Sequence, residues 1–182
     1  MSYNIFTKPT EAFRYEIENP SVLRALIFVI ITSILLSILA LSIGGTIITA
    51  GAILILNIFQ WLVISIVLWA FEFMFSPKKR KIHELSFKEA VSLTGKIWMA
   101  SAIIVFLILI GIILSIVGLS VIAIILIFIM GIILIIDTYK MTQVALDIET
   151  KRAIIPWILL ILVYFLLLAF IMQISELTLP IF

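Results

Sequence analysis

A run without a single charged side chain, from Ile97 to Ile136, constrains this sequence more than any other feature. As one α-helix the run would be roughly 60 Å long, about twice the thickness of the hydrocarbon core of a bilayer. The chain must therefore reverse inside it. We expect the reversal at "SIVGLS" (Ser115–Ser120), which predicts two spans at about residues 97–114 and 121–136.

Three further apolar segments predict spans at about residues 22–43, 47–75 and 153–172, since a helix of about 20 residues crosses a bilayer. Adjacent glycines in "SIGGTI" (Ser42–Ile47) favour a tight turn between the first two. Only 12% of residues are charged, and the surface of a soluble domain needs roughly a quarter to a third. The fold class we expect is an all-α, polytopic transmembrane bundle of five spans, with residues 1–182 as a single integral membrane domain.

The basic residues indicate the orientation of these spans. Five spans place the N-terminal tail, a loop at residues 76–96 and a connector at 137–152 on one side of the membrane. All twelve Lys and Arg residues fall in this set when Arg24, at the start of the first span, is counted with the tail. Basic loops remain cytoplasmic, so we expect a cytoplasmic N-terminus and an external or lumenal C-terminus. The basic run within the first loop then faces anionic headgroups rather than nucleic acid; it comprises Lys78, Lys79, Arg80 and Lys81.

The N-terminal tail carries an amphipathic pattern. Phe13 and Ile17 form an i, i+4 apolar pair among charged residues, which predicts a short interfacial helix. The tail lacks the basic start, short apolar core and cleavage site of a secretory signal, so we expect the first apolar stretch to remain in the mature protein.

Catalytic motifs are not recognisable in this sequence. There is no Cys, and the only histidine, His83, cannot form a HExxH zinc site alone. No nucleophile elbow, phosphate-binding glycine loop or carboxylate cluster is present. The sequence therefore predicts a protein that is not an enzyme, with no cofactor and no metal.

Four polar residues fall within the apolar segments. Asn57 and Gln60 share one face of the second span, and we favour a role in binding neighbouring helices over the alternative, a polar solute path. Glu72 and Asp137 lie near cytoplasmic span ends, where they can reach interfacial water or lysine partners; a proton relay is the less favoured reading.

The segments "KPTEAFRYEIENPSVLRAL" (Lys8–Leu26) and "SFKEAVSLTGK" (Ser86–Lys96), together with five spans, resemble the Yip domain family of Rab-associated integral membrane proteins, in a compact prokaryotic form. The resemblance implies a cytoplasmic N-terminus, no catalysis and a role in organising membrane proteins or lipid. Eukaryotic members carry a Gly-Tyr pair where Gly95 precedes Lys96 here, and an Asp-Leu-Tyr-Gly-Pro element that is missing. These departures weigh against GTPase binding.

Two functions remain open. The first is a non-enzymatic scaffold in the cell membrane, if the chain is prokaryotic, that binds other membrane proteins, a second copy of itself or anionic lipid. The second is a small oligomeric transporter or channel with a polar path at the second span. The expected partner-binding or lipid-binding residues of the scaffold are Phe13, Ile17, Lys78, Lys79, Arg80, Lys81 and Phe87.

Overall fold

The computed structural model of this protein describes residues 5–42, 44–75, 84–116 and 120–178. These residues form six helices, and five of them are long and apolar enough to cross a membrane. The all-helical class and the five spans are therefore confirmed, and a short N-terminal helix precedes them. The helices are α1 (Pro9–Glu18), α2 (Val22–Ser42), α3 (Ile47–Phe75), α4 (Phe87–Ile116), α5 (Ser120–Ala145) and α6 (Thr150–Thr178).

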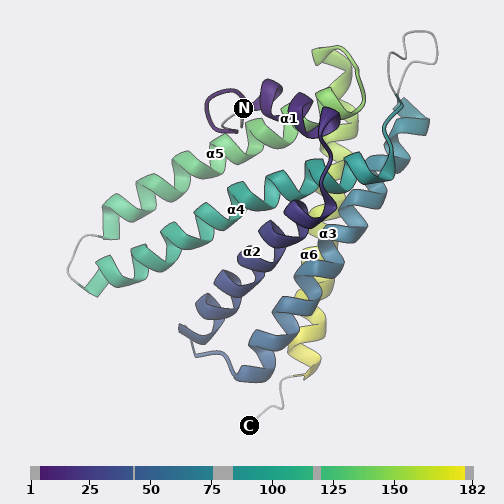
Figure 1. The fold of residues 1–182 in the computed structure, drawn as a ribbon. Coiled ribbons are helices and arrows are strands. Elements are labelled where there is room, and N and C mark those ends of the chain that lie inside the picture. The colour runs from purple at the N-terminus through teal and green to yellow at the C-terminus, as the bar shows by residue number, and fades with distance from the viewer. Residues whose placement is uncertain (1–4, 43, 76–83, 117–119, 179–182) are drawn as a thin grey trace.

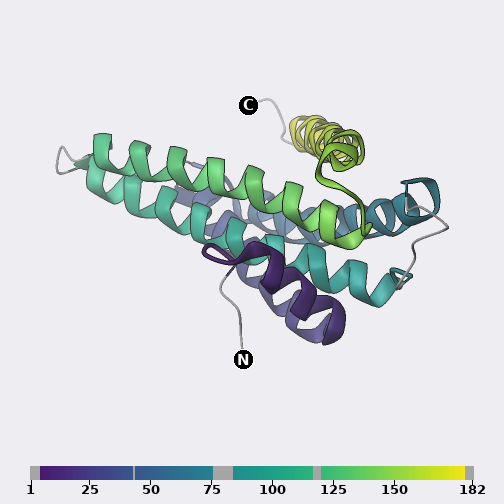
Figure 2. The ribbon, with the colours of Figure 1, turned by 90° about the horizontal axis from the view of Figure 1, so that it is seen from above.

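The helices gather the polar connections at one end of the bundle. Figure 1 shows α1, the start of α4 and the junction between α5 and α6 together, whereas the turn between α2 and α3 lies at the opposite end. We call the first the basic end, formed by residues 8–24, 84–96 and 140–152. The hairpin of α4 and α5 diverges from α3 and α6 away from this end, and the view from above places α1 and α6 on opposite sides of it (Figure 2).

The turn between α2 and α3 depends on its two glycines. Gly44 has a φ of +97°, a left-handed conformation that side chains with a Cβ rarely adopt. A Cβ at Gly45 would lie 2.7 Å from the carbonyl oxygen of Ala40, to which the Gly45 N–H donates a hydrogen bond. The tight turn predicted at this position is confirmed.

The loop expected at residues 76–96 is shorter than predicted. Helix α4 begins at Phe87, because the Ser86 N–H donates to the Glu89 carboxylate at 2.6 Å and the Glu89 N–H donates to the Ser86 hydroxyl at 3.3 Å. This reciprocal pair is a capping box. Every residue from Glu89 to Trp98 is buried, so a segment that reads as a polar loop lies at the centre of the bundle.

Two other predicted boundaries also differ from the structure. Helix α5 continues to Ala145 and α6 begins at Thr150, so most of the connector expected at 137–152 is helical. The reversal predicted at Ser115–Ser120 falls between the end of α4 and the start of α5; residues 117–119 lie outside the described residues. Hydropathy located the spans but not their ends, because polar side chains buried within the protein extend the helices.

Helices α2 and α4 cross in close contact at Gly95. A Cβ at this position would lie 2.6 Å from the Cα of Ala25, so only glycine permits the two backbones to approach this closely. Ala25 is itself buried on the facing surface of α2. The crossing places the buried first third of α4 directly against the first span.

We expect Gly95→Ala to lower the stability of the protein. Alanine favours a helix by about 1 kcal/mol over glycine, but overpacking at a tight contact costs about 1 to 3 kcal/mol. The midpoint of thermal unfolding in detergent should therefore fall. Gly131→Ala is the matched control, because a Cβ there meets no atom within 4 Å and the same change should leave the midpoint equal or higher. Equal midpoints in the two variants would contradict the close crossing.

Candidate functional site at the basic end and in the polar interior

A buried carboxylate joins three helices at the basic end. Glu16 on α1 is 2% exposed, and its Oε1 lies 3.6 Å from Nζ of Lys96 on α4. Its Oε2 lies 3.5 Å from a guanidinium nitrogen of Arg24 on α2. The side chain of Lys96 is 8% exposed and that of Arg24 is 35% exposed, so the contact with Lys96 is the more sheltered of the two.

Two serines complete this site. The Ser92 hydroxyl donates to Oε2 of Glu16 at 2.7 Å and accepts a hydrogen bond from the Ser21 N–H at 3.1 Å. The arrangement links α1, the start of α2 and α4. A carboxylate between two cations and a hydroxyl is well matched electrostatically, and this matching is what makes its burial tolerable.

Sequence reasoning missed this site, because it treated Arg24 and Lys96 only as cytoplasmic charges. One signal was available. Glu16 lies one turn after Ala12 and Phe13, on the face of the N-terminal helix that is buried. An acidic residue on the apolar face of an amphipathic helix needs a cationic partner, and the cations that border the first and third spans are candidates for it.

We expect Glu16→Gln to release α1 from the bundle, because the charge of Lys96 would then be buried without a counter-ion. Breaking a buried ion pair costs about 3 to 5 kcal/mol, and the partial exposure of Arg24 reduces its share. Hydrogen–deuterium exchange of the α1 amides should accelerate. A double variant, Glu16→Gln with Lys96→Gln, should recover part of the protection.

The matched control for this change is Glu11→Gln on the same helix. Glu11 pairs with Lys8 at 3.4 Å, but both side chains are about half exposed, so this pair contributes at most about 1 kcal/mol. Exchange in α1 should therefore stay close to that of the unaltered protein. Equal acceleration by both substitutions would refute the role of Glu16.

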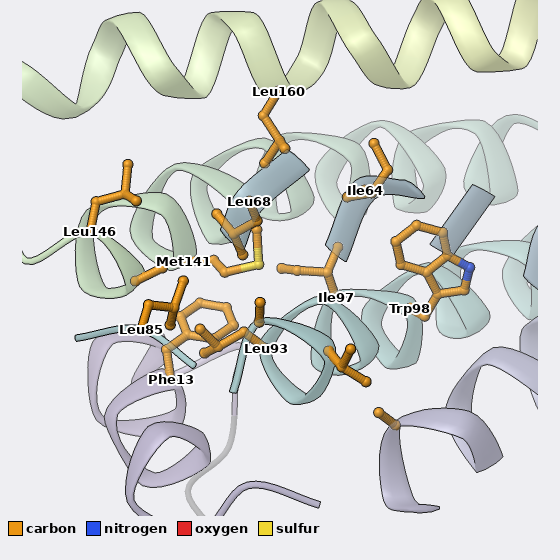
Figure 3. Close-up of a cluster of buried hydrophobic side chains, with 14 of the residues drawn as sticks. Phe13, Ile64, Leu68, Leu85, Leu93, Ile97, Trp98, Met141, Leu146 and Leu160 are labelled. Atoms are coloured by element: carbon orange, nitrogen blue, oxygen red, sulfur yellow. The ribbon is translucent and has the colours of Figure 1, made fainter. Parts of the chain in front are cut away.

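The expected partner-binding residues differ in how far the structure exposes them. Phe13 is 0% exposed and packs beside Leu85 and Leu93 (Figure 3), so it holds α1 in place and offers no surface to a partner. The reason is that the apolar face of α1 packs on protein. Ile17 is partly buried against the same core. The four basic residues Lys78, Lys79, Arg80 and Lys81 lie outside the described residues.

Phe87 is exposed at the start of α4 and belongs to an aromatic group at the basic end. Its ring lies 6.0 Å from that of Trp69 in an edge-to-face arrangement, and Trp69 contacts Phe73 in the same way at 5.3 Å. Phe73 is also exposed. Exposed aromatic rings beside a Trp at the end of a span are typical of the membrane interface.

Charges of both signs cover the described surface of the basic end. The exposed acidic residues there accompany an equal number of exposed basic ones, so this surface has little net charge of its own. The basic residues are Lys8, Arg14, Lys88, Lys151 and Arg152; the acidic ones are Glu11, Glu18, Glu84, Asp147 and Glu149.

Asn57 connects three spans in the interior of the bundle. Its Nδ2 donates to the Ser33 hydroxyl on α2 at 2.7 Å, and its Oδ1 accepts from the Trp98 indole N–H on α4 at 3.2 Å. Thr32 reinforces the contact between α2 and α4 by donating to the carbonyl oxygen of Trp98. Both ends of the Asn57 amide are thus used within the protein.

A second interior network joins α3 to α4. The Trp61 indole N–H donates to the Thr94 hydroxyl at 3.1 Å, and the Ser65 and Thr94 hydroxyls lie 2.7 Å apart. The Thr94 side chain is completely buried. Hydrogen bonds of this kind contribute about 1 kcal/mol each to the association of membrane helices.

The remaining intramembrane polar residues are also buried. Gln60 is 4% exposed, and its Nε2 has no hydrogen-bond partner among the described residues. Glu72 and Asp137 are 2% and 1% exposed, so neither side chain lies open to interfacial water as we expected. The helices that carry them, α3 and α5, both pack against α4.

We expect Asn57→Leu to destabilise the bundle, since it leaves the Trp98 N–H buried without an acceptor, at a cost of about 1 to 3 kcal/mol. Gln60→Leu is the matched control one turn away, and it should cost little because the Gln60 Nε2 makes no hydrogen bond with the described residues. Thermal unfolding in detergent measures the difference. Equal stabilities of the two variants would contradict a role of Asn57 in holding α2, α3 and α4 together.

The family assignment rests on a match that covers most of the chain. The model of the Yip1 domain matches residues 3–171, which include α1 to α5 and most of α6. The chain belongs to the Yip1 domain family. Comparison with curated proteins gives no match, and comparison with solved structures also gives none. As a Yip1 family protein with five apolar spans, it is an integral multi-pass membrane protein.

Proposed function

We propose that this Yip1 family protein is a non-enzymatic scaffold that organises membrane-protein partners or anionic lipid through its basic end. One observation carries the proposal: every described Lys and Arg lies in or directly before α1, at the start of α2, in the first third of α4, at the end of α5 or in the first turn of α6. These segments meet at the basic end (Figure 1). Exposed aromatic rings at Phe73 and Phe87 provide apolar contact area beside them.

The proposal places the basic end in the cytoplasm, because basic segments are retained there. The chain has no Cys, so single cysteines report the orientation cleanly. A membrane-impermeant thiol reagent added to intact cells should label Thr46→Cys and should not label Asp147→Cys. Both positions are exposed, at opposite ends of the bundle. Labelling of Asp147→Cys alone would show the opposite orientation, with the basic end outside the cell.

The buried polar side chains favour a scaffold over a transporter. A polar path needs side chains that exchange hydrogen bonds with a passing solute. Asn57 instead uses both of its polar atoms for Ser33 and Trp98, and Thr94 is held by Trp61 and Ser65. These groups stabilise the contacts between helices, which is what a rigid platform requires.

The four basic residues of the loop supply the charge that the described surface lacks, because the exposed charges on that surface largely offset one another. A variant with Gln at Lys78, Lys79, Arg80 and Lys81 should therefore lose co-purifying anionic lipid or partner protein. Each lysine or arginine near an anionic membrane contributes about 1 kcal/mol. The measurement is quantitative mass spectrometry of material extracted in native nanodiscs.

The matched control removes the same number of charges from the described surface, with Gln at Arg14, Lys88, Lys151 and Arg152. We expect a smaller loss, since acidic side chains lie near each of these residues along the chain. Undiminished association in the loop variant would refute the scaffold. Equal losses in the two variants would assign the binding to the whole basic end rather than to the loop.

A further inference from the structure

A cavity of about 360 Å³ lies between the spans, where the hairpin of α4 and α5 diverges from α3 and α6. Apolar side chains from these four helices form most of its wall, including the deeply buried Ile64, Ile97, Met141 and Leu160. In Figure 3, Leu160 projects from α6 toward the side chains below it. The cavity is more than twice as large as an engineered cavity of about 150 Å³ that is known to bind benzene.

Apart from the hydroxyl of Tyr164, which belongs to an exposed side chain, the side-chain polar groups of the wall are already hydrogen-bonded within the protein. The Ser101 hydroxyl donates to the carbonyl oxygen of Ile97. The Thr138 hydroxyl donates to the carbonyl oxygen of Ile135 and accepts a hydrogen bond from the Trp157 indole N–H. Thr32, Asn57 and Thr94 are engaged in the contacts between helices. The wall therefore offers little to water or to a polar solute, which need several polar partners.

The cavity reaches the outer surface of the bundle between α5 and α6. Ile135 on α5 and Phe165 on α6 line it, and both are more than half exposed. In a multi-pass membrane protein these two spans face lipid hydrocarbon at this depth. The medium outside the opening is thus made of acyl chains, the one ligand class whose chemistry matches the wall.

We propose that the cavity is a binding site for one acyl chain of a bilayer phospholipid, which enters between α5 and α6. A cavity of this size without an occupant would forfeit the dispersion contacts of its lining. Pockets of about 300 to 1,000 Å³ with mainly apolar walls are typical ligand sites. The occupant contacts α3, α4, α5 and α6 together, so it stabilises the region where the hairpin separates from the other spans. The proposal is independent of the scaffold function.

A photoreactive phospholipid tests this site. The full-length protein is placed in nanodiscs that contain a small fraction of phosphatidylcholine with a diazirine on one acyl chain, and labelled residues are mapped by mass spectrometry after illumination. We expect label at Leu160, which is 4% exposed and lines the cavity, as well as at the exposed Phe170. Leu68 is 0% exposed and does not line the cavity, and it should stay unlabelled.

A larger side chain in the cavity should exclude the acyl chain. Val105→Phe adds a ring to a buried lining residue, and label at Leu160 should fall several-fold while label at Phe170 is unchanged. Ile113→Phe is the matched control on the same helix, because Ile113 is exposed and does not line the cavity. Ser101→Leu is a second filling variant at the same wall, for use if Val105→Phe does not fold.

The outcomes distinguish a phospholipid from a free fatty acid as the source of the acyl chain. Label at Leu160 from the phospholipid, lost in a filling variant, supports the site. Label confined to exposed residues such as Phe170, or unchanged label at Leu160 in a folded filling variant, overturns it. A parallel sample carries a diazirine-labelled free fatty acid instead, and label at Leu160 from this probe alone would overturn the assignment to phospholipid.

Discussion

The contact between α2 and α4 at Gly95 is the constraint on which the rest of the structure depends. Only the absence of a Cβ permits Ala25 to approach this backbone, and the approach buries every residue of α4 from Glu89 to Trp98. That burial brings Lys96 to Glu16 and Trp98 to Asn57. One close crossing thereby sets the position of the N-terminal helix and of the interior hydrogen bonds.

Polar groups inside this bundle serve helix association, because a bilayer provides no water with which unpaired groups can bond. Asn57 and Thr94 each connect separate spans through hydrogen bonds of ordinary length. The same physics explains the wall of the cavity, where the hydroxyls of Ser101 and Thr138 turn back to their own helices. Because these side chains bond within the protein, the wall of the cavity is mainly apolar.

The basic end and the cavity divide the molecule into two regions with different chemistry. At the basic end, an ion-paired α1 covers the start of α4, and exposed charges of both signs surround exposed aromatic rings. Within the membrane, α5 and α6 are the spans least buried by the protein, and the cavity opens between them. The α4 and α5 hairpin belongs to both regions, because it starts at the basic end and diverges from the remaining spans away from it (Figure 1).

The sequence by itself determined the membrane class, the five spans, the glycine turn and the family, because length, hydropathy and charge placement are local properties of the chain. It did not determine that Phe13 and Glu16 are buried, that residues 87–96 are helical, or that a cavity exists. Those features depend on which helix faces lie against one another. A side chain such as Lys96 reads as a loop charge until tertiary packing provides its counter-ion, so only the folded arrangement decided its role.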